Sequence, residues 1–163
     1  MPKHTIHPVF DNRSSVLILG SFPSVRSREV GFFYSQPQNR FWRVLSRVFG
    51  EEVPQTTEDK RAFLLSHRIA LWDVVASCEI QGSADQSMRD VVANDLSAVL
   101  SAAPIHTIYL NGKTAEKYYQ KLLSPTRAFP AVTLPSTSPA NAAWSLDRLV
   151  AAWSIIKEAE NSP

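Results

Sequence analysis

The chain of 163 residues is long enough for one ordinary domain and too short for two, and its hydrophobic content of 44% can fill a single core. Its net charge of +2, from 17 basic and 15 acidic residues, neither requires nor excludes a nucleic-acid partner. A single cysteine, Cys78, excludes an intramolecular disulfide framework and a four-cysteine metal site. The first ten residues lack the apolar core of a signal peptide, and no segment is apolar enough to span a bilayer. We therefore expect a cytoplasmic protein with one domain over residues 1–163.

The first half of the chain predicts a strand, two helices and a second strand. The nearly continuous apolar run over 15–21 predicts a strand that is buried on both faces. A helix is expected to begin near Pro37 and to carry apolar residues at helical spacing until Gly50 ends it. A second helix is expected over 57–66, and a second strand over 68–75 leads into a polar loop.

The second half continues this alternation of helices and strands. The apolar residues of the third predicted helix recur with a 3.6-residue period and are Met88, Val91, Val92, Leu96, Val99 and Leu100. A third strand over 105–110 is followed by a helix over 113–123, and a fourth strand is expected over 131–135. The last predicted helix has an apolar stripe of Leu146, Leu149, Val150, Trp153 and Ile156.

Strands separated by helices predict an α/β fold with three layers, α/β/α, around a central four-stranded parallel sheet. Ligands of such sheets bind beyond the carboxyl ends of the strands. The loops that begin at Ser21, Asp73, Asn111 and Ser136 are therefore expected to converge on one site. The run "FYSQPQNRFW", residues 33–42, follows the first of these loops, so its rings and amides are expected beside that site.

Several common catalytic motifs are incomplete in this sequence. "NGKTA" (111–115) ends like a phosphate-binding P-loop, but Thr107 stands where the first glycine of that motif belongs. "GSFPS" (20–24) is not the G-x-S-x-G turn of serine hydrolases. The four histidines have no partners at metal-ligand spacing, and Cys78 is more simply a packed residue than a nucleophile. We therefore expect no metal and no cofactor.

Three segments together resemble the two active-site motifs of the uracil-DNA glycosylase superfamily. They are "LILGSFPS", "GFFYSQPQNRFWRVL" and "LPSTSPANA", and the resemblance covers about residues 15–155 in order and spacing. "PQNRFW" is especially similar to the mismatch-specific uracil and thymine glycosylases. Phe22 stands where that branch has an asparagine in its first motif, and Ser136 replaces the usual histidine of the second. A lost first-motif asparagine with "PQNRFW" retained is similar to the hypoxanthine-DNA glycosylase family, in which the residue that matches Asn39 is the expected catalytic residue.

The resemblance implies a monofunctional DNA glycosylase that removes a deaminated base, with hypoxanthine as the first candidate and uracil as the second. Such an enzyme extrudes a nucleotide from the duplex, at a cost of a few kcal/mol, and binds the base by stacking and hydrogen bonds. The candidates for binding the base are Ser21, Phe22, Phe33 and Tyr34. Phe41 and Trp42, on the predicted helix, are expected to pack in the core instead.

Asn39 is the candidate catalytic residue because its amide can accept a hydrogen bond from a water molecule and aim that water at the anomeric carbon. Little base strength is needed once the sugar approaches an oxocarbenium ion, since charge stabilisation carries much of the barrier. Asp73, at the end of the second predicted strand, is the alternative residue for activating the water. A structural role for Asn39, in bracing its helix, also stays open.

The segment "STSPAN", residues 136–141, is expected to bind DNA phosphates beside the extruded nucleotide through hydroxyls and backbone amides. The candidate phosphate-binding residues are Ser136, Thr137, Ser138, Asn141 and Lys113. Pro139 and Ala140 are expected to form a small wedge in the gap that the base leaves. An ordinary turn before the last helix is the alternative for this segment. Further basic residues near the expected site are Arg26, Arg28, Arg40, Arg43 and Lys117.

Two other classes of function stay open. A chain that lost the first-motif asparagine could be a catalytically silent DNA- or nucleotide-binding module, and a hydrolase of free nucleosides is a weaker alternative. Release of a free base from lesion-containing DNA separates these classes. We expect a monomer whose partner is DNA that contains a deaminated base, with no membrane partner.

Overall fold

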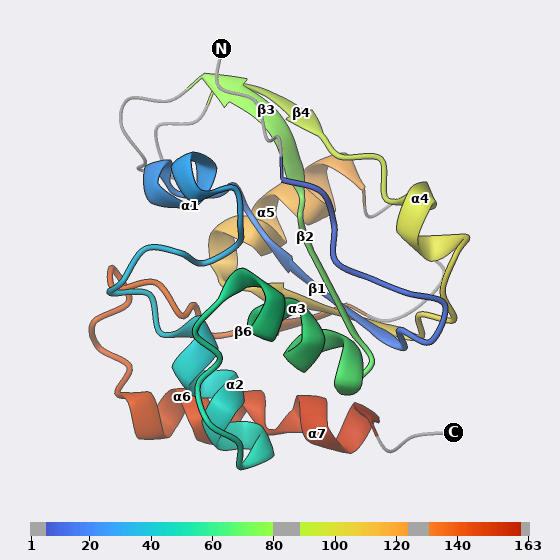
Figure 1. The fold of residues 1–163 in the computed structure, drawn as a ribbon. Helices are drawn as coiled ribbons and strands as arrows, with labels where there is room; N and C mark the ends of the chain where they lie inside the picture. Colours follow the sequence, from blue (N-terminus) through green and yellow to red (C-terminus); the bar gives the residue numbers. More distant parts are fainter. Residues whose placement is uncertain (1–5, 80–88, 124–130, 161–163) are drawn as a thin grey trace.

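The computed structural model describes residues 6–79, 89–123 and 131–160. Its centre is a parallel sheet of four strands in the order β2-β1-β5-β6. Figure 1 labels β1, β2 and β6 of this sheet, with helices around them. The strands of this sheet are β1 Val16–Gly20, β2 Ile69–Asp73, β5 Thr107–Asn111 and β6 Ala131–Leu134. The predicted α/β class and its central four-stranded parallel sheet are therefore confirmed.

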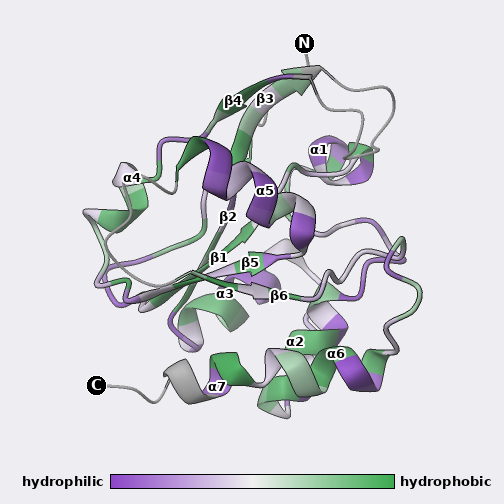
Figure 2. Cartoon of the chain, turned by 180° about the vertical axis from the view of Figure 1, so that it is seen from behind, coloured by the Kyte–Doolittle hydropathy of each residue, from purple (hydrophilic) through white to green (hydrophobic). Residues whose placement is uncertain are grey.

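Two helical layers enclose this sheet because side chains of a strand alternate between its faces. In β1, Val16 and Ile18 belong to one hydrophobic cluster, and Leu17 and Leu19 belong to the other. The helices of the first cluster are α2 Phe41–Phe49, α3 Thr57–Ser66, α6 Leu146–Trp153 and α7 Ile155–Glu160. The helices of the second are α5 Lys113–Leu122 and the short α4 Ser97–Leu100. Figure 2 shows hydrophobic residues, in green, along β1 and hydrophilic residues, in purple, on α5 and α6.

The helix α2 fixes the position of "PQNRFW" next to the sheet. Its buried residues include Phe41, Trp42, Val44 and Val48, so the helix is anchored in the core from its first turn. Both Phe41 and Trp42 thus pack in the core as expected. Gly50 ends the helix with φ 68°, a left-handed conformation that glycine adopts without strain.

The prediction of a third helix is wrong for residues 89–93. Arg89–Ala93 forms a strand, β4, that pairs antiparallel with β3 Val75–Glu79 in a separate two-stranded sheet, and only α4 is helical in this region. The neighbouring β-branched residues Val91 and Val92 differ in environment, because Val91 packs against the core and Val92 is exposed. Pairing between the two strands therefore decides the structure here, rather than the helical spacing of the apolar residues. Met88 lies outside the described residues.

Three smaller differences concern element boundaries. The polar segment Val25–Val30 forms a helix, α1, that the sequence pattern does not predict, with Ser24 capping its first turn and Gly31 ending it. The last predicted helix is interrupted at Ser154, whose hydroxyl donates a hydrogen bond back to the preceding turn, and becomes α6 and α7. The second predicted strand is divided at Val74 between β2 and β3.

Candidate active site

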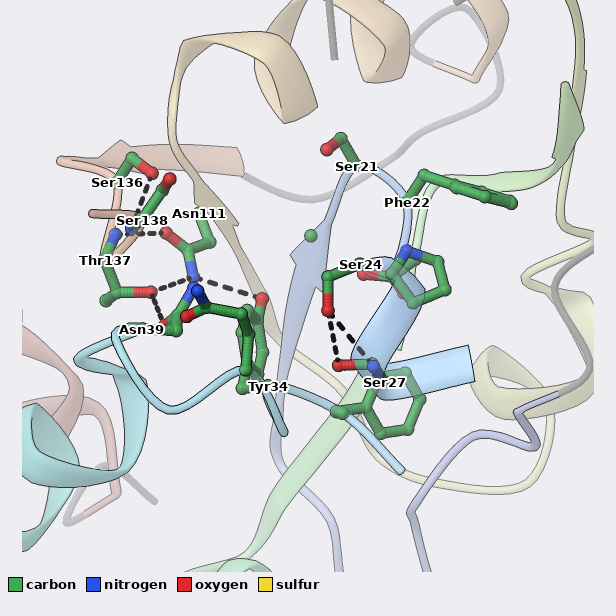
Figure 3. A pocket seen from close by; sticks show the side chains of 15 residues that line it. Ser21, Phe22, Ser24, Ser27, Tyr34, Asn39, Asn111, Ser136, Thr137 and Ser138 are labelled. Carbon is green, nitrogen blue, oxygen red and sulfur yellow. Dashed lines mark hydrogen bonds between the residues drawn. The ribbon is translucent and has the colours of Figure 1, made fainter. Parts of the chain in front are cut away.

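A pocket opens at the carboxyl end of the parallel sheet, where the loops after β1, β2, β5 and β6 meet (Figure 3). Gly20, Asp73 and Asn111 end their strands, and Ser136 follows β6 by two residues. The four loops therefore converge as the sequence predicts. The residues that line the pocket are Gly20, Ser21, Phe22, Pro23, Ser24, Ser27, Phe33, Tyr34, Gln36, Asn39, Asp73, Asn111, Ser136, Thr137 and Ser138.

The pocket is small, with a volume of about 130 Å³. A cavity of about 150 Å³ holds one benzene molecule, so this pocket is matched to a flat ring system rather than to a whole nucleotide. Its lining combines aromatic rings with hydroxyl, amide and carboxylate groups. Such a lining can stack a ring and form hydrogen bonds with its edge.

The three aromatic rings of the pocket differ in their surroundings. Tyr34 stacks on Phe41, with the ring centroids 4.0 Å apart and the planes 15° from parallel. Phe22 is half-buried, and the guanidinium of Arg28 lies 5.2 Å from its ring centroid. Phe33 is only 1% exposed and belongs to the core. Phe22 and Tyr34 therefore offer the more accessible aromatic surfaces, and Phe33 lines the pocket as a buried core residue.

Gly20 allows two polar groups to come close to the end of β1. A methyl group on its Cα would overlap Oδ1 of Asp73 and would lie 2.7 Å from the hydroxyl of Tyr34. Asp73 is 3% exposed, and its backbone carbonyl accepts a hydrogen bond of 2.9 Å from Nδ2 of Asn94. The lack of a side chain at position 20 thus brings the carboxylate of Asp73 and the phenol of Tyr34 to the same pocket wall.

For the glycosylase activity that the sequence resemblance implies, we expect Gly20→Ala to lower single-turnover base excision about 10²-fold, because a displacement of about 1 Å in a site has effects on that scale. The added methyl group also overpacks the pocket wall, which lowers the free energy of unfolding by about 1–3 kcal/mol. Stopped reactions under single-turnover conditions, corrected for the folded fraction, measure the rate. The control is Gly50→Ala, which strains a left-handed position remote from the pocket and should lower stability only. Normal excision by Gly20→Ala would contradict the assigned pocket.

Asn39 lies where the two sequence motifs meet. Its Oδ1 accepts a hydrogen bond of 2.9 Å from the backbone N–H of Phe41, which makes a turn before α2. The same oxygen accepts a hydrogen bond of 2.8 Å from Oγ1 of Thr137, in the second motif (Figure 3). The side chain of Asn39 therefore both braces the start of α2 and lines the pocket.

Asn111 completes this hydrogen-bond network, and the sequence interpretation did not single out its side chain. Its Oδ1 accepts from the backbone N–H of Thr137 at 3.1 Å. Its Nδ2 donates to Oγ1 of Thr137 at 3.0 Å and to the hydroxyl of Tyr34 at 3.1 Å. The position of Asn111 at the carboxyl end of a buried strand was the available sequence signal for such a role.

Arg40 holds the STSPAN loop (residues 136–141) in place. Its guanidinium donates to the backbone carbonyls of Ser138 and Asn141, each at 3.1 Å, and to that of Trp144. Its backbone N–H donates to the carbonyl of Thr137 at 3.0 Å. Arg40, one of the basic residues expected near the site, therefore has a structural role, because its guanidinium donates hydrogen bonds to three protein carbonyls.

The STSPAN loop presents only part of its expected phosphate-binding set to solvent. Thr137 is completely buried, and its hydroxyl donates a hydrogen bond to Asn39. The side chain of Thr137 therefore makes an internal contact instead of the expected phosphate contact. Ser136 and Ser138 are partly exposed, and their hydroxyl oxygens accept the backbone N–H groups of Ser138 and Ala140 at 3.1 Å. Each of these two hydroxyls keeps a proton that it can donate to a phosphate.

The remaining expected DNA contacts lie around the same loop. Nδ2 of Asn141 donates to the backbone carbonyl of Ser136 at 3.0 Å, which closes the loop. Pro139 and Ala140 are exposed between them, as a wedge requires. Lys113 is exposed at the first turn of α5, directly after Gly112, whose Cα faces Ser136. These placements leave the wedge and the phosphate contacts as predictions.

Two further properties concern residues 6–79, 89–123 and 131–160. No group of three or more histidine, cysteine, aspartate or glutamate side chains there could hold a metal ion. In the same part of the chain, none of the helices has the length and apolar character needed to cross a membrane.

Comparison with known proteins identifies the family. Residues 7–158 match the model of the uracil DNA glycosylase superfamily. The chain belongs to this superfamily. Its predicted family and its class, a DNA glycosylase, are thereby confirmed.

Similar proteins cover between 72% and 96% of the chain. A hypoxanthine DNA glycosylase of Methanosarcina acetivorans is 34% identical over 150 residues, which are 91% of this chain and 94% of that protein. A hypoxanthine DNA glycosylase of Methanosarcina barkeri is 32% identical over 120 residues, which are 72% of this chain and 76% of that protein. A solution structure from M. acetivorans, described as a candidate uracil DNA glycosylase, has a TM-score of 0.81 and 32% identity and covers 96% of this chain and 97% of its own.

Proposed function

We propose that the protein is a monofunctional glycosylase that removes hypoxanthine from DNA. The observation that carries this proposal is the placement of Asn39 on the wall of a pocket sized for one ring system, while Phe22 occupies the first-motif position. Relatives with 32% and 34% identity named hypoxanthine DNA glycosylase support the same substrate.

The polar groups of the pocket fit the edge of hypoxanthine. This base carries an N–H and a carbonyl where adenine carries a ring nitrogen and an amino group. The carboxylate of Asp73 can accept a hydrogen bond from the N–H of hypoxanthine. The corresponding ring nitrogen of adenine is itself an acceptor, so its lone pair would repel the carboxylate. Phe22 and Tyr34 supply stacking surfaces for the flipped base. Uracil also has an N–H between carbonyls, which makes it the second candidate.

The reaction is a hydrolysis of the N-glycosidic bond. The bond between C1′ and the base nitrogen breaks, and its electron pair moves to the base. A water oxygen forms the new bond to C1′, and the proton that it loses balances the protonation of the released base. The protein forms no covalent bond in this sequence, so its task is to position the groups and to stabilise charge.

Docking on DNA is proposed to depend on the STSPAN loop and the first turn of α5. Neutral hydroxyls and backbone amides can hold phosphates without a large positive charge, which agrees with a net charge of +2. The exposed Pro139 and Ala140 would occupy the space that the flipped nucleotide vacates. Lys113 adds one cation beside Ser136.

We expect Ser138→Ala to weaken affinity for lesion-containing DNA about three- to ten-fold, the scale of one hydrogen bond, and to slow excision. The ranking of lesions should stay the same, because phosphate contacts position the complex and base contacts specify it. Titration of labelled duplexes measures the affinity, and Ser66→Ala, on α3, is the matched control. A changed ranking with unchanged affinity would mean that Ser138 faces the base.

The experiment that tests the proposal is a panel of matched duplexes carrying hypoxanthine, uracil, xanthine or a mismatched thymine. Cleavage of the abasic product by alkali reports excision of each base. We expect the fastest excision from the hypoxanthine duplex. Faster excision of uracil would replace the proposed substrate, and binding without excision of any base would indicate the catalytically silent alternative. Release from free deoxyinosine at the rate seen with DNA would indicate a nucleoside hydrolase.

A further inference from the structure

The orientation of the Asn39 carboxamide is fixed by a backbone group. The backbone N–H of Phe41 can only donate a hydrogen bond, so the Asn39 atom that lies 2.9 Å from it must be the oxygen. Nδ2 therefore occupies the other branch of the planar amide. The common ambiguity between the oxygen and the nitrogen of an asparagine side chain is removed at this position.

The same reasoning fixes Asn111 and the proton of Thr137. Because the backbone N–H of Thr137 donates to Oδ1 of Asn111, the atom of Asn111 bonded to Oγ1 of Thr137 must be Nδ2. Oγ1 of Thr137 therefore accepts from Asn111, and its single proton is directed to Oδ1 of Asn39. The hydrogen bonds run in one direction, from Asn111 through Thr137 to Asn39 (Figure 3).

This direction determines what Asn39 presents to the pocket. An amide oxygen has two lone pairs, and both are used, one by Phe41 and one by Thr137. Among the residues that the structure describes, none accepts a hydrogen bond from Nδ2 of Asn39, which lines the pocket and is partly exposed. The group available to a substrate is therefore the donor Nδ2. Oδ1 has no lone pair left to accept a hydrogen bond from water, contrary to the role expected from the sequence.

We propose that Asn39 acts as a hydrogen-bond donor to the departing base through Nδ2, and that Thr137 and Asn111 are positioning residues that keep it in this orientation. This inference rests on the glycosylase function proposed above. When the bond to C1′ breaks, its electron pair moves to the base, and a donor aimed at the base stabilises the charge that develops there. A donor cannot remove a proton from water, so Asn39 contributes through the leaving group.

The variant Asn39→Asp separates the donor role from the acceptor role with almost no change in shape. One carboxylate oxygen can keep both bonds to Phe41 and Thr137, and the other places an acceptor where the amide had a donor. We expect single-turnover excision of hypoxanthine at neutral pH to fall at least about 10²-fold, to the level of Asn39→Ala or lower. As the pH falls through the pKa of the introduced carboxyl group, its protonated form supplies a donor, and the loss relative to wild type should shrink.

The matched control is Asn12→Asp, which makes the same change in charge on an exposed residue near the amino end of β1 and should leave excision unchanged. Excision by Asn39→Asp at or above the wild-type rate at neutral pH would overturn the donor assignment, because a carboxylate is the better acceptor for water. A wild-type protein that releases no base from any duplex would instead overturn the proposed glycosylase function.

The positioning role is tested by removing the hydroxyl of Thr137. We expect Thr137→Val to lower single-turnover excision about 10-fold with little change in DNA affinity, and Thr137→Ser, which keeps the hydroxyl, to restore most of the rate. In an Asn39→Ala background the same change should have no further effect, because the two residues act as one unit. Thr133→Val, which removes a hydroxyl bonded to Glu116 instead, is the control. An equal loss in both backgrounds would show that Thr137 acts independently of Asn39.

Discussion

Replacement of Asn39 by alanine is expected to lower single-turnover excision of hypoxanthine at least about 10²-fold, the scale for loss of one well-placed polar group. The affinity for DNA should change little, because the hydroxyls of Ser136 and Ser138, which are proposed to hold the DNA backbone, make hydrogen bonds that do not involve Asn39. Excision and affinity are measured on the same deoxyinosine duplex. The change also removes the acceptor of the hydrogen bonds from Phe41 and from the buried hydroxyl of Thr137, so stability falls by about 1–3 kcal/mol and rates need correction for the folded fraction.

The outcome for Asn39→Ala also decides between two candidate residues. Asn12→Ala, on the exposed turn before β1, is the control for removal of an asparagine side chain. Near-normal excision by Asn39→Ala would move the catalytic role to Asp73, whose carboxylate lines the same pocket.

Replacement of Arg40 by alanine is expected to have the largest effect on the STSPAN loop. The change removes donors to three backbone carbonyls and should lower the free energy of unfolding by about 2–3 kcal/mol, since hydrogen bonds to charged groups are worth about 1.5–3 kcal/mol each and part of the loss is recovered by hydration. DNA affinity and excision should fall together. Urea unfolding and duplex titration measure the two effects.

Two variants test whether the guanidinium geometry of Arg40 matters. Arg40→Lys should not restore stability, because an ammonium lacks the planar fork that reaches several carbonyls. Arg43→Ala, three residues further along α2 and exposed, should be close to wild type. Unchanged unfolding of Arg40→Ala would contradict the role assigned to this residue.

The parallel sheet could be predicted because its strands are short apolar runs, and such runs are buried on both faces in α/β proteins. The expected strand over 15–21 is β1, and the expected helix over 57–66 has the observed bounds of α3. The convergence of the loops after Gly20, Asp73 and Asn111 follows from the topology alone. Sequence was therefore sufficient to place the pocket.

The antiparallel pairing of β3 and β4 could not be predicted from local spacing, since valines at adjacent positions suit a strand or a helix until a partner strand is known. The hydrogen bonds inside the site could not be predicted for a related reason. The motif predicts that Thr137 faces DNA, but its hydroxyl donates a hydrogen bond to Asn39, which lies 98 residues away in the chain. Arg40 likewise contacts the loop around Asn141 across 101 residues. Side-chain directions over such separations depend on tertiary packing rather than on the motif.

Identification of the released product tests the proposed glycosylase reaction most directly. The protein is incubated with a duplex containing one deoxyinosine, and free base is quantified by liquid chromatography and mass spectrometry beside the abasic sites in the strand. We expect free hypoxanthine in an amount equal to the abasic sites, no strand cleavage before alkali treatment, and at least about 10²-fold less product from Asn39→Ala under single-turnover conditions. Intact deoxyinosine DNA after prolonged incubation with excess protein would contradict the proposed reaction. As much product from Asn39→Ala as from the wild-type protein would contradict the proposed role of Asn39.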